Sequence, residues 1–321
     1  MDALDKAPLN VTDVVLKSHG MDHRLLKLAR IARAKLLVTV RDPRDSVVSQ
    51  RERFGLTLHQ AAMDISQSIA SIGSIPADLP TLQFVYEEGF TQRVQTVADV
   101  AKFLDVEVND TTIQEIFDSL VPDRIRERIA ERQADLPPDE DPGCDPLTLW
   151  HSTHVGDGRI GKWKDRLDVA SQHAVSDCLD AMALPNLRMG KPLTWPASFF
   201  TCNGSMPQQA PTRLTSDGSD DQIAYGPYLC LPRGRWRAVA MIESDSLRHL
   251  DVDAEIYLPW EDRALAQRRT RVSCFAHSVI DLDFDHDDHF QPLEARLRAV
   301  GGTAGACKFA GWQFFWLGDR A

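Results

Sequence analysis

The chain has 321 residues, enough for two domains of ordinary size, and its 43% hydrophobic and 26% charged residues are typical of globular proteins. Lys and Arg number 36 and Asp and Glu 47, so the net charge of −11 disfavours non-specific binding of nucleic acid. No apolar run approaches the roughly 18 residues of a membrane-spanning helix, and the polar N-terminus does not resemble a signal peptide, so we expect a cytoplasmic protein.

The first half of the chain alternates short β-branched runs with helical patterns. The apolar runs at residues 13–18 (DVVLKS), 35–40 (KLLVTV) and 82–86 (LQFVY) predict strands. Helical spacing of apolar residues predicts helices over 22–34, 46–54, 56–75, 91–104 and 111–133. Strands separated by helices predict βαβ units and a parallel sheet, as in α/β folds.

The second half contains little helical pattern. Strands are predicted within the segments 225–231, 236–243, 252–259, 270–284, 293–300 and 308–317. Their turn-like joins indicate an antiparallel β-sandwich. The segment 196–221 is rich in Pro, Ser, Gly and Asp and is typical of a linker. The sequence therefore predicts an α/β domain over 1–195, a linker over 196–221 and a β-sandwich over 222–321.

The most informative segment is RDPRDSVVS at residues 41–49, which directly follows the strand at 35–40. A loop at the carboxyl end of a parallel strand lies where open α/β sheets bind ligands, and the helix that follows it presents free amide donors suited to a phosphate. Arg41 can add a bidentate contact, and Ser49 offers a hydroxyl two helical turns later. The alternative is a solvated loop with local Arg–Asp pairs.

Three further polar segments occupy strand ends or loops. In Lys17-Ser18-His19, the imidazole can take a proton from an alcohol near neutral pH, and the lysine can neutralise charge on a transferring group. Tyr86 opens a polar tip after the strand at 82–86. The segment GDGRIGKWK, at 156–164, combines glycines with basic residues and could approach an anion closely. Each segment alone is equally compatible with an exposed loop.

Together and in this order, the four segments resemble the sulfotransferase family that uses 3′-phosphoadenosine 5′-phosphosulfate (PAPS). RDPRDSVVS is similar to the family's 3′-phosphate motif, and KSH to the strand-end motif that holds its catalytic base. VYEE, with the helix ending AKFLDV, is similar to the family's YED segment, and GDGRIGKWK to its late loop RKGxxGxWK. The resemblance covers about residues 11–185 and implies a P-loop-NTPase-like parallel sheet.

This resemblance implies a function for the α/β domain, which is transfer of a sulfuryl group from PAPS to a hydroxyl with no metal requirement. Arg41 and Ser49 would bind the 3′-phosphate of PAPS or of its product PAP, and Tyr86 would lie near the adenosine. Gly158 and its loop would close on the phosphate.

The resemblance also implies a catalytic pair. His19 would be the general base on the acceptor hydroxyl, and Lys17 would stabilise the sulfuryl group during transfer. The acceptor is expected to be a small molecule or a glycan.

Two departures from the family pattern leave alternatives open. Gly156 and Asp157 occupy the places of the Arg-Lys pair in the late loop, although Arg159 is adjacent and could substitute. The family's [KR]-x-G-[ST]-[ST] turn, which grips the 5′-phosphosulfate, has no counterpart before Lys17. The chain as given could start downstream of the true N-terminus, or it could be a degenerate member with exposed strand edges. The competing functions are a non-catalytic PAP- or glycan-binding protein and a plain interaction module.

Two segments of the predicted sandwich invite other functions. DLDFDHDDH at 281–289 is rich in metal-ligand types, but strand alternation would divide them between two faces, so a solvated acidic strand end is the better prediction. The aromatic run at 312–316 is more typical of a sandwich core than of a sugar platform. The segment 225–240 loosely resembles β-sandwich modules attached to glycan-modifying enzymes, and this is the basis for expecting a carbohydrate acceptor.

Overall fold

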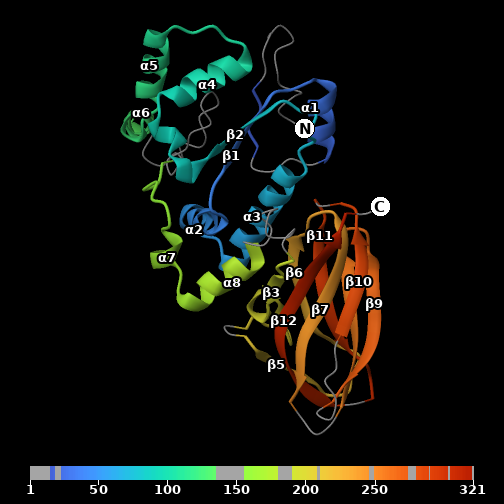
Figure 1. Ribbon diagram of the computed structural model, residues 1–321. Helices are drawn as coiled ribbons and strands as arrows, with labels where there is room; N and C mark the ends of the chain where they lie inside the picture. Colours follow the sequence, from blue (N-terminus) through green and yellow to red (C-terminus); the bar gives the residue numbers. More distant parts are fainter. Residues whose placement is uncertain are drawn as a thin grey trace.

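The computed structural model describes nine stretches of the chain. They are residues 15–18, 23–134, 155–179, 190–207, 210–245, 249–273, 280–288, 290–302 and 304–319. An α/β part is followed by an antiparallel β-sandwich, and the two lie one above the other in Figure 1. The predicted fold class is therefore confirmed. In the described residues, no helix is long and apolar enough to cross a membrane.

The α/β part is built around one pair of strands. Strand β1 (Leu36–Val40) pairs in parallel with β2 (Thr81–Val85), and Val40 lies opposite Val85 at the carboxyl end. The α-helices are α1 (His23–Ile31), α2 (Pro43–Phe54), α3 (Leu58–Gly73), α4 (Gln95–Leu104), α5 (Asp110–Ser119), α6 (Pro122–Ala134), α7 (Trp163–Arg166) and α8 (Val169–Leu179). Short 3-10 turns η1 (Tyr86–Glu88) and η2 (Phe90–Gln92) follow β2.

Two predicted elements of this part are wrong. The strand predicted over 13–18 is not formed in its described residues, 15–18, where Val15 is 94% exposed. An apolar run becomes a strand only by pairing, and the parallel sheet of the described residues consists of β1 and β2 alone. The helix predicted over 111–133 is two helices. Pro122 cannot continue a helix, but its fixed φ suits the first position of the next one.

Local capping defines the turn from α2 into α3. Asp42 caps α2 by accepting a hydrogen bond from the Arg44 N–H, and Gly55 ends α2 at φ 65°, a conformation that glycine adopts without strain. Thr57 and Gln60 then form a reciprocal capping box at the start of α3. β1 is therefore followed almost directly by α2, which begins at the carboxyl edge of the sheet.

The sandwich consists of two five-stranded antiparallel sheets. One has the order β10-β7-β12-β3 with β5 also paired to β12, and the other has the order β4-β6-β11-β8-β9. The strands are β3 (Leu193–Pro196), β4 (Thr201–Cys202), β5 (Thr212–Ser216), β6 (Gln222–Cys230), β7 (Gly234–Ser244), β8 (Leu250–Leu258), β9 (Arg263–Val272), β10 (Ile280–His286), β11 (Pro292–Ala299) and β12 (Gly305–Gly318).

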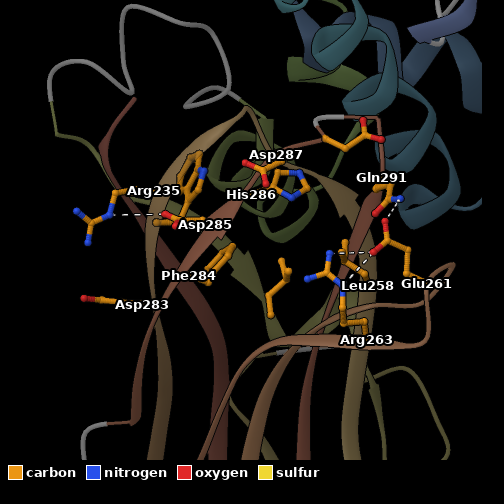
Figure 2. A pocket seen from close by; sticks show the side chains of 13 residues that line it. Arg235, Leu258, Glu261, Arg263, Asp283, Phe284, Asp285, His286, Asp287 and Gln291 are labelled. Carbon is orange, nitrogen blue, oxygen red and sulfur yellow. Dashed lines mark hydrogen bonds and ion pairs between the residues drawn. The ribbon is translucent and has the colours of Figure 1, made fainter. Parts of the chain in front are cut away.

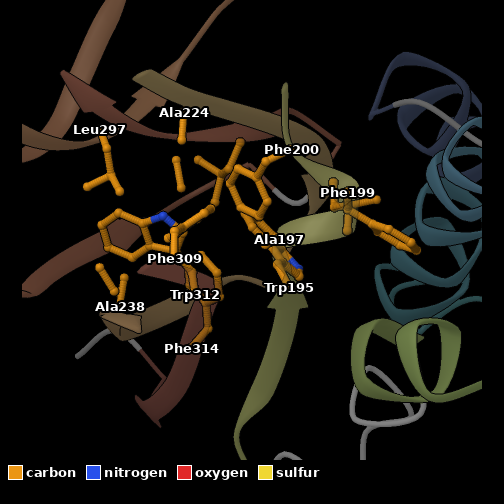
Figure 3. Packing of buried hydrophobic residues seen from close by; sticks show 14 of the residues in the cluster. Trp195, Ala197, Phe199, Phe200, Ala224, Ala238, Leu297, Phe309, Trp312 and Phe314 are labelled. Carbon is orange, nitrogen blue, oxygen red and sulfur yellow. The ribbon is translucent and has the colours of Figure 1, made fainter. Parts of the chain in front are cut away.

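Aromatic rings fill the space between the two sheets (Figure 3). Trp195 and Phe314 pack with ring centroids 4.1 Å apart, and Phe200 meets Phe309 edge-on at 5.3 Å. These four side chains and Trp312 are fully buried. The prediction that the aromatic run of β12 belongs to the core is therefore confirmed for Trp312 and Phe314.

The segment 196–221 is not a linker. It contains β4, β5 and the 3-10 turn η4 (Ala197–Phe199), and its Phe200 and Leu214 are fully buried. Its Pro- and Ser-rich composition concealed these short strands because both depend on pairing, β5 with β12 about 90 residues later and β4 with β6. The sandwich accordingly begins with β3, ahead of the boundary predicted at residue 222.

The two parts share one continuous core. Val47 of α2, Ala61 of α3 and Val175 of α8 belong to the same buried cluster as the sandwich aromatics. Helix α3 packs against β6, and the His59 Nε2 lies 2.7 Å from the carbonyl oxygen of Pro227. The α/β part is therefore supported by the sandwich as well as by its own small sheet.

Candidate functional site

The candidate site begins where β1 and β2 end. Arg41 directly follows β1 and Tyr86 directly follows β2, so the parallel register places the two residues side by side. The guanidinium carbon of Arg41 lies 4.5 Å from the centroid of the Tyr86 ring. This separation is typical of a cation–π contact, which holds the guanidinium at the carboxyl edge of the sheet.

The loop at 156–164 packs onto this pair from far along the sequence. The Tyr86 hydroxyl donates a hydrogen bond to the Gly158 carbonyl oxygen at 2.9 Å, and Arg41 Nη2 donates to the Arg159 carbonyl oxygen at 2.7 Å. Gly158 has φ +64°, and a Cβ there would lie 3.1 Å from the Tyr86 hydroxyl. The left-handed backbone conformation and the close approach of Tyr86 both favour glycine at this position.

Asp45 fastens the loop to α2. Its carboxylate is fully buried and accepts hydrogen bonds from the N–H groups of Gly161 at 2.6 Å and Trp163 at 3.0 Å. Arg41 Nη2 lies 3.4 Å from the same carboxylate. A buried carboxylate requires such partners, so Asp45 couples the helix, the loop and Arg41 into one unit. This role was not predicted, because the sequence shows only an Asp directly before the helix predicted over 46–54.

Further ion pairs stabilise the start of α2 and the end of the 156–164 loop, on either side of the site. Burial raises the pKa of Asp42, but hydrogen bonds from Arg44 outweigh it, and the net effect is a lowered pKa. The guanidinium carbon of Arg44 also lies 4.1 Å from the Trp163 ring centroid. On the other side, the buried Lys162 places its Nζ 2.8 Å from Glu52 Oε2. Arg44 and Lys162 thus lie within 2.8 Å of a carboxylate oxygen, whereas the nearest carboxylate to Arg41 lies farther away, at 3.4 Å.

Arg41 retains a donor that is not used. Its Nη2 is engaged, but its Nε is buried and has no hydrogen-bond partner among the described residues. A buried donor left in this state costs about 1–3 kcal/mol. An anion that reached this nitrogen would remove the penalty, and the guanidinium would contribute its charge as well.

The predicted site residues fall into three groups. Arg41, Tyr86, Gly158 and Arg159 are brought into direct contact, as described above. Ser49 lies half-buried on α2. The catalytic pair is not placed at a strand end, because Lys17 is exposed within the non-strand stretch 15–18 and His19 lies outside the described residues. The predicted roles of these residues stay predictions.

The acidic segment that begins at residue 281 alternates as expected for a strand. Leu282, Phe284 and His286 are buried, whereas Asp283 and Asp285 are directed toward Arg237 and Arg235 of the neighbouring strand β7. No group of three or more His, Cys, Asp or Glu side chains within the described ranges is arranged to hold a metal ion.

Comparison with known proteins identifies resemblances of fold. A mouse sulfotransferase crystallised with PAP is similar to this chain with 18% identity and a TM-score of 0.39, over 52% of this chain and 63% of that one. The xylan-binding domain of Paenibacillus barcinonensis Xyn10C matches 41% of this chain over 97% of its own length, with 10% identity and a TM-score of 0.26. A Clostridium thermocellum xylanase in complex with xylohexaose matches 40% of the chain over 28% of its own, with 9% identity and a TM-score of 0.24.

No protein-family model matches the chain, and the search of curated proteins returned no significant match. The chain spans less than two thirds of the mouse sulfotransferase. The identities are low and the TM-scores are below 0.5, so the activity of this chain must be argued from its own residues.

Proposed function

We propose that the α/β part binds PAPS, or its product PAP, through the 3′-phosphate at Arg41, and transfers the sulfuryl group to a hydroxyl acceptor such as a carbohydrate. The observation that carries the proposal is the unused, buried Nε of Arg41 beside the Gly158 loop. A phosphate oxygen satisfies this donor and is attracted by the guanidinium charge.

The surrounding residues suit a nucleotide with a phosphate on its ribose. Ser49 of α2 adds a hydroxyl for the phosphate, whereas the N–H groups of Arg44 and Ser46 already donate to Asp42. Tyr86 offers an aromatic ring beside the adenosine, and Arg159 adds positive charge on the loop. The loop is already anchored by Asp45, so little ordering entropy is lost when the ligand binds.

In the transfer step, His19 takes the proton of the acceptor hydroxyl as the hydroxyl oxygen attacks sulfur. A new S–O bond forms while the bond from sulfur to the 5′-phosphate oxygen breaks, and PAP leaves with the electron pair. Lys17 neutralises the charge that grows on the transferring group. The products are a sulfate ester and PAP.

A second candidate is a protein of the same fold that binds PAP without transferring sulfate. One observation favours it: the β1–β2 sheet leaves Leu37 47% exposed, as expected for a degenerate member with an exposed sheet. Both candidates predict binding of the ribose phosphate at Arg41, and they differ in turnover alone.

Calorimetric titration with adenosine 3′,5′-bisphosphate tests the shared part. We expect Arg41→Ala to weaken binding about 10- to 100-fold, because hydrogen bonds to a charged group are worth about 1.5–3 kcal/mol. Arg30→Ala is the matched control, since Arg30 is exposed and pairs with Asp78. The corresponding affinity for adenosine 5′-monophosphate should be insensitive to Arg41→Ala. No binding by the unmodified chain, or equal binding by the Arg41 variant, would contradict the proposal.

A radiolabelled sulfate-transfer assay separates the two candidates. We expect His19→Ala to lower turnover about 10²- to 10⁴-fold while PAP binding is retained, and His173→Ala, an exposed residue of α8, to have no effect. Full turnover by the His19 variant would remove this residue from the mechanism. PAP binding by the unmodified chain without any transfer would establish the second candidate.

A further inference from the structure

A cavity of about 430 Å³ opens at one end of the sandwich (Figure 2). Both sheets contribute to it, through Arg235 and Asp285 on one side and Leu258 and Arg263 on the other. This size lies within the range of about 300–1,000 Å³ that small-molecule sites occupy. None of its residues belongs to the Arg41 site.

The cavity lies at the end of the sandwich that adjoins α3. The Ser66 Oγ of α3 accepts a hydrogen bond from the Cys230 N–H at 3.4 Å, and the Cys230 Sγ lies 3.8 Å from the Phe290 carbonyl oxygen. The next residue, Gln291, lines the cavity. Contacts through Cys230 therefore link the cavity wall to α3, the helix that packs the α/β part against β6 of the sandwich.

Polar groups form most of the cavity lining, and a few apolar side chains lie among them. Phe284 and Leu258 are almost fully buried, and the buried Trp236 lines the cavity with them. These aromatic and aliphatic groups offer a small apolar contact for the C–H face of a pyranose or furanose ring.

Planar polar side chains in the cavity walls are held in fixed orientations by hydrogen bonds to one another. Arg263 donates to Glu261 Oε2 through Nε at 3.0 Å and Nη2 at 2.8 Å, and Gln291 Nε2 donates to Glu261 Oε1 at 2.7 Å. Arg235 lies 3.6 Å from Asp285 of the adjacent strand, on one side of the cavity. The Gln291 Oε1 is buried and has no hydrogen-bond partner in the described part of the chain. Adjacent donors and acceptors of this kind suit the neighbouring hydroxyls of a sugar, and a hydroxyl would satisfy Gln291.

The charge of the lining restricts the ligand further. Five carboxylates and two guanidinium groups line the cavity, so an anionic ligand such as a uronic acid or a sulfated sugar is repelled. We propose that the cavity binds a single terminal residue of an uncharged saccharide. The inference stands independently of the nucleotide site, because it uses none of the same residues.

The test is a titration of the intact chain, followed by NMR or calorimetry, with the methyl glycosides of glucose, galactose, mannose and xylose. Glucuronate serves as the anionic comparator. We expect at least one neutral glycoside to bind and glucuronate to bind at least tenfold more weakly. Gln291→Ala should weaken binding about tenfold, whereas Gln267→Ala, the same change at an exposed position of β9, should leave it unchanged.

Glu261→Gln is a second variant at an exposed side chain, so it tests the cavity without disturbing the core. It should also lower the affinity for the glycoside about tenfold while the affinity for adenosine 3′,5′-bisphosphate stays unchanged. Failure of all four neutral glycosides to bind at 10 mM, roughly ten times the dissociation constant of a 4 kcal/mol interaction, would overturn the inference. Binding that is insensitive to both Gln291→Ala and Glu261→Gln would overturn it equally.

Discussion

The two halves of the molecule differ in how they bury their apolar side chains. The sandwich encloses Trp195, Trp236, Trp312 and several Phe side chains between two sheets. The α/β part has a sheet of two strands, one of which exposes Leu37, and its helices α4 and α5 contain no buried residue. The difference teaches that the α/β part obtains much of its support from the sandwich, through α3 and α8, and from ion pairs around the Arg41 site.

The largest expected effect comes from the sandwich core. Trp312→Ala removes a fully buried ring and should lower the free energy of unfolding by about 3–5 kcal/mol, because the lost burial and the resulting cavity both destabilise. Leu37→Ala, on the exposed face of β1, should cost less than about 1 kcal/mol. Urea denaturation followed by circular dichroism measures both variants. Equal losses would mean that the two halves are packed alike.

The next effect concerns the polar support of the α/β part. Asp45→Asn keeps the size of the side chain but replaces an acceptor that faces Gly161 or Trp163 with a donor. We expect a loss of about 1.5–3 kcal/mol and faster amide hydrogen exchange in residues 156–164. Asp64→Asn, at an exposed position of α3, is the matched control. Unchanged exchange in the loop would show that Asp45 does not hold it.

The elements that sequence predicts well are those determined by local interactions. The helix after KLLVTV and the alternating strands β7 and β10 were predicted because the periodicity of apolar residues is a local pattern that extends over a few residues. The first seven residues of β9 were missed because RALAQRR is rich in charged and polar residues and has no alternating apolar pattern, as an exposed edge strand can be. Strand β5 was missed because its partner β12 lies far along the chain, and β4 because it has only two residues.

Prediction of the candidate site from sequence is limited in the same way, to the parts that local motifs define. Arg41, Tyr86 and Gly158 were found through motifs at the ends of predicted strands and in a glycine-rich loop. Asp45 was missed because its partners, Gly161 and Trp163, are more than 110 residues away. No local sequence pattern predicts a contact over that separation. The cavity at the end of the sandwich is assembled from four separate segments, so sequence alone could not reveal it.

Acidification should weaken the contact between the two halves. Burial lowers the pKa of His59 below its ordinary 6.5, although its hydrogen bond to the Pro227 carbonyl opposes the shift. The unfolded chain therefore takes up a proton more readily than the folded one below pH 6.5, and stability falls as pH decreases from there, by at most about 1.4 kcal/mol per pH unit. His59→Gln, which keeps a donor for Pro227, should reduce this slope between pH 6.5 and 5 in urea denaturation. An unchanged slope would assign the acid sensitivity to other groups.

The smallest effect is expected on the outer surface of the sandwich, where ion pairs are numerous but solvated. Arg237 binds Asp283 with two hydrogen bonds, at 2.7 and 2.9 Å, and both side chains are 46% exposed. Water and salt screen such a pair, and ordering two side chains opposes its attraction. Arg237→Lys, which cannot reproduce the bidentate geometry, should leave the urea midpoint indistinguishable from that of the unmodified chain at 0.15 M salt. A clear loss would mean that the sandwich, like the α/β part, depends on ion pairs for stability, and the contrast between the two halves would then rest on their cores alone.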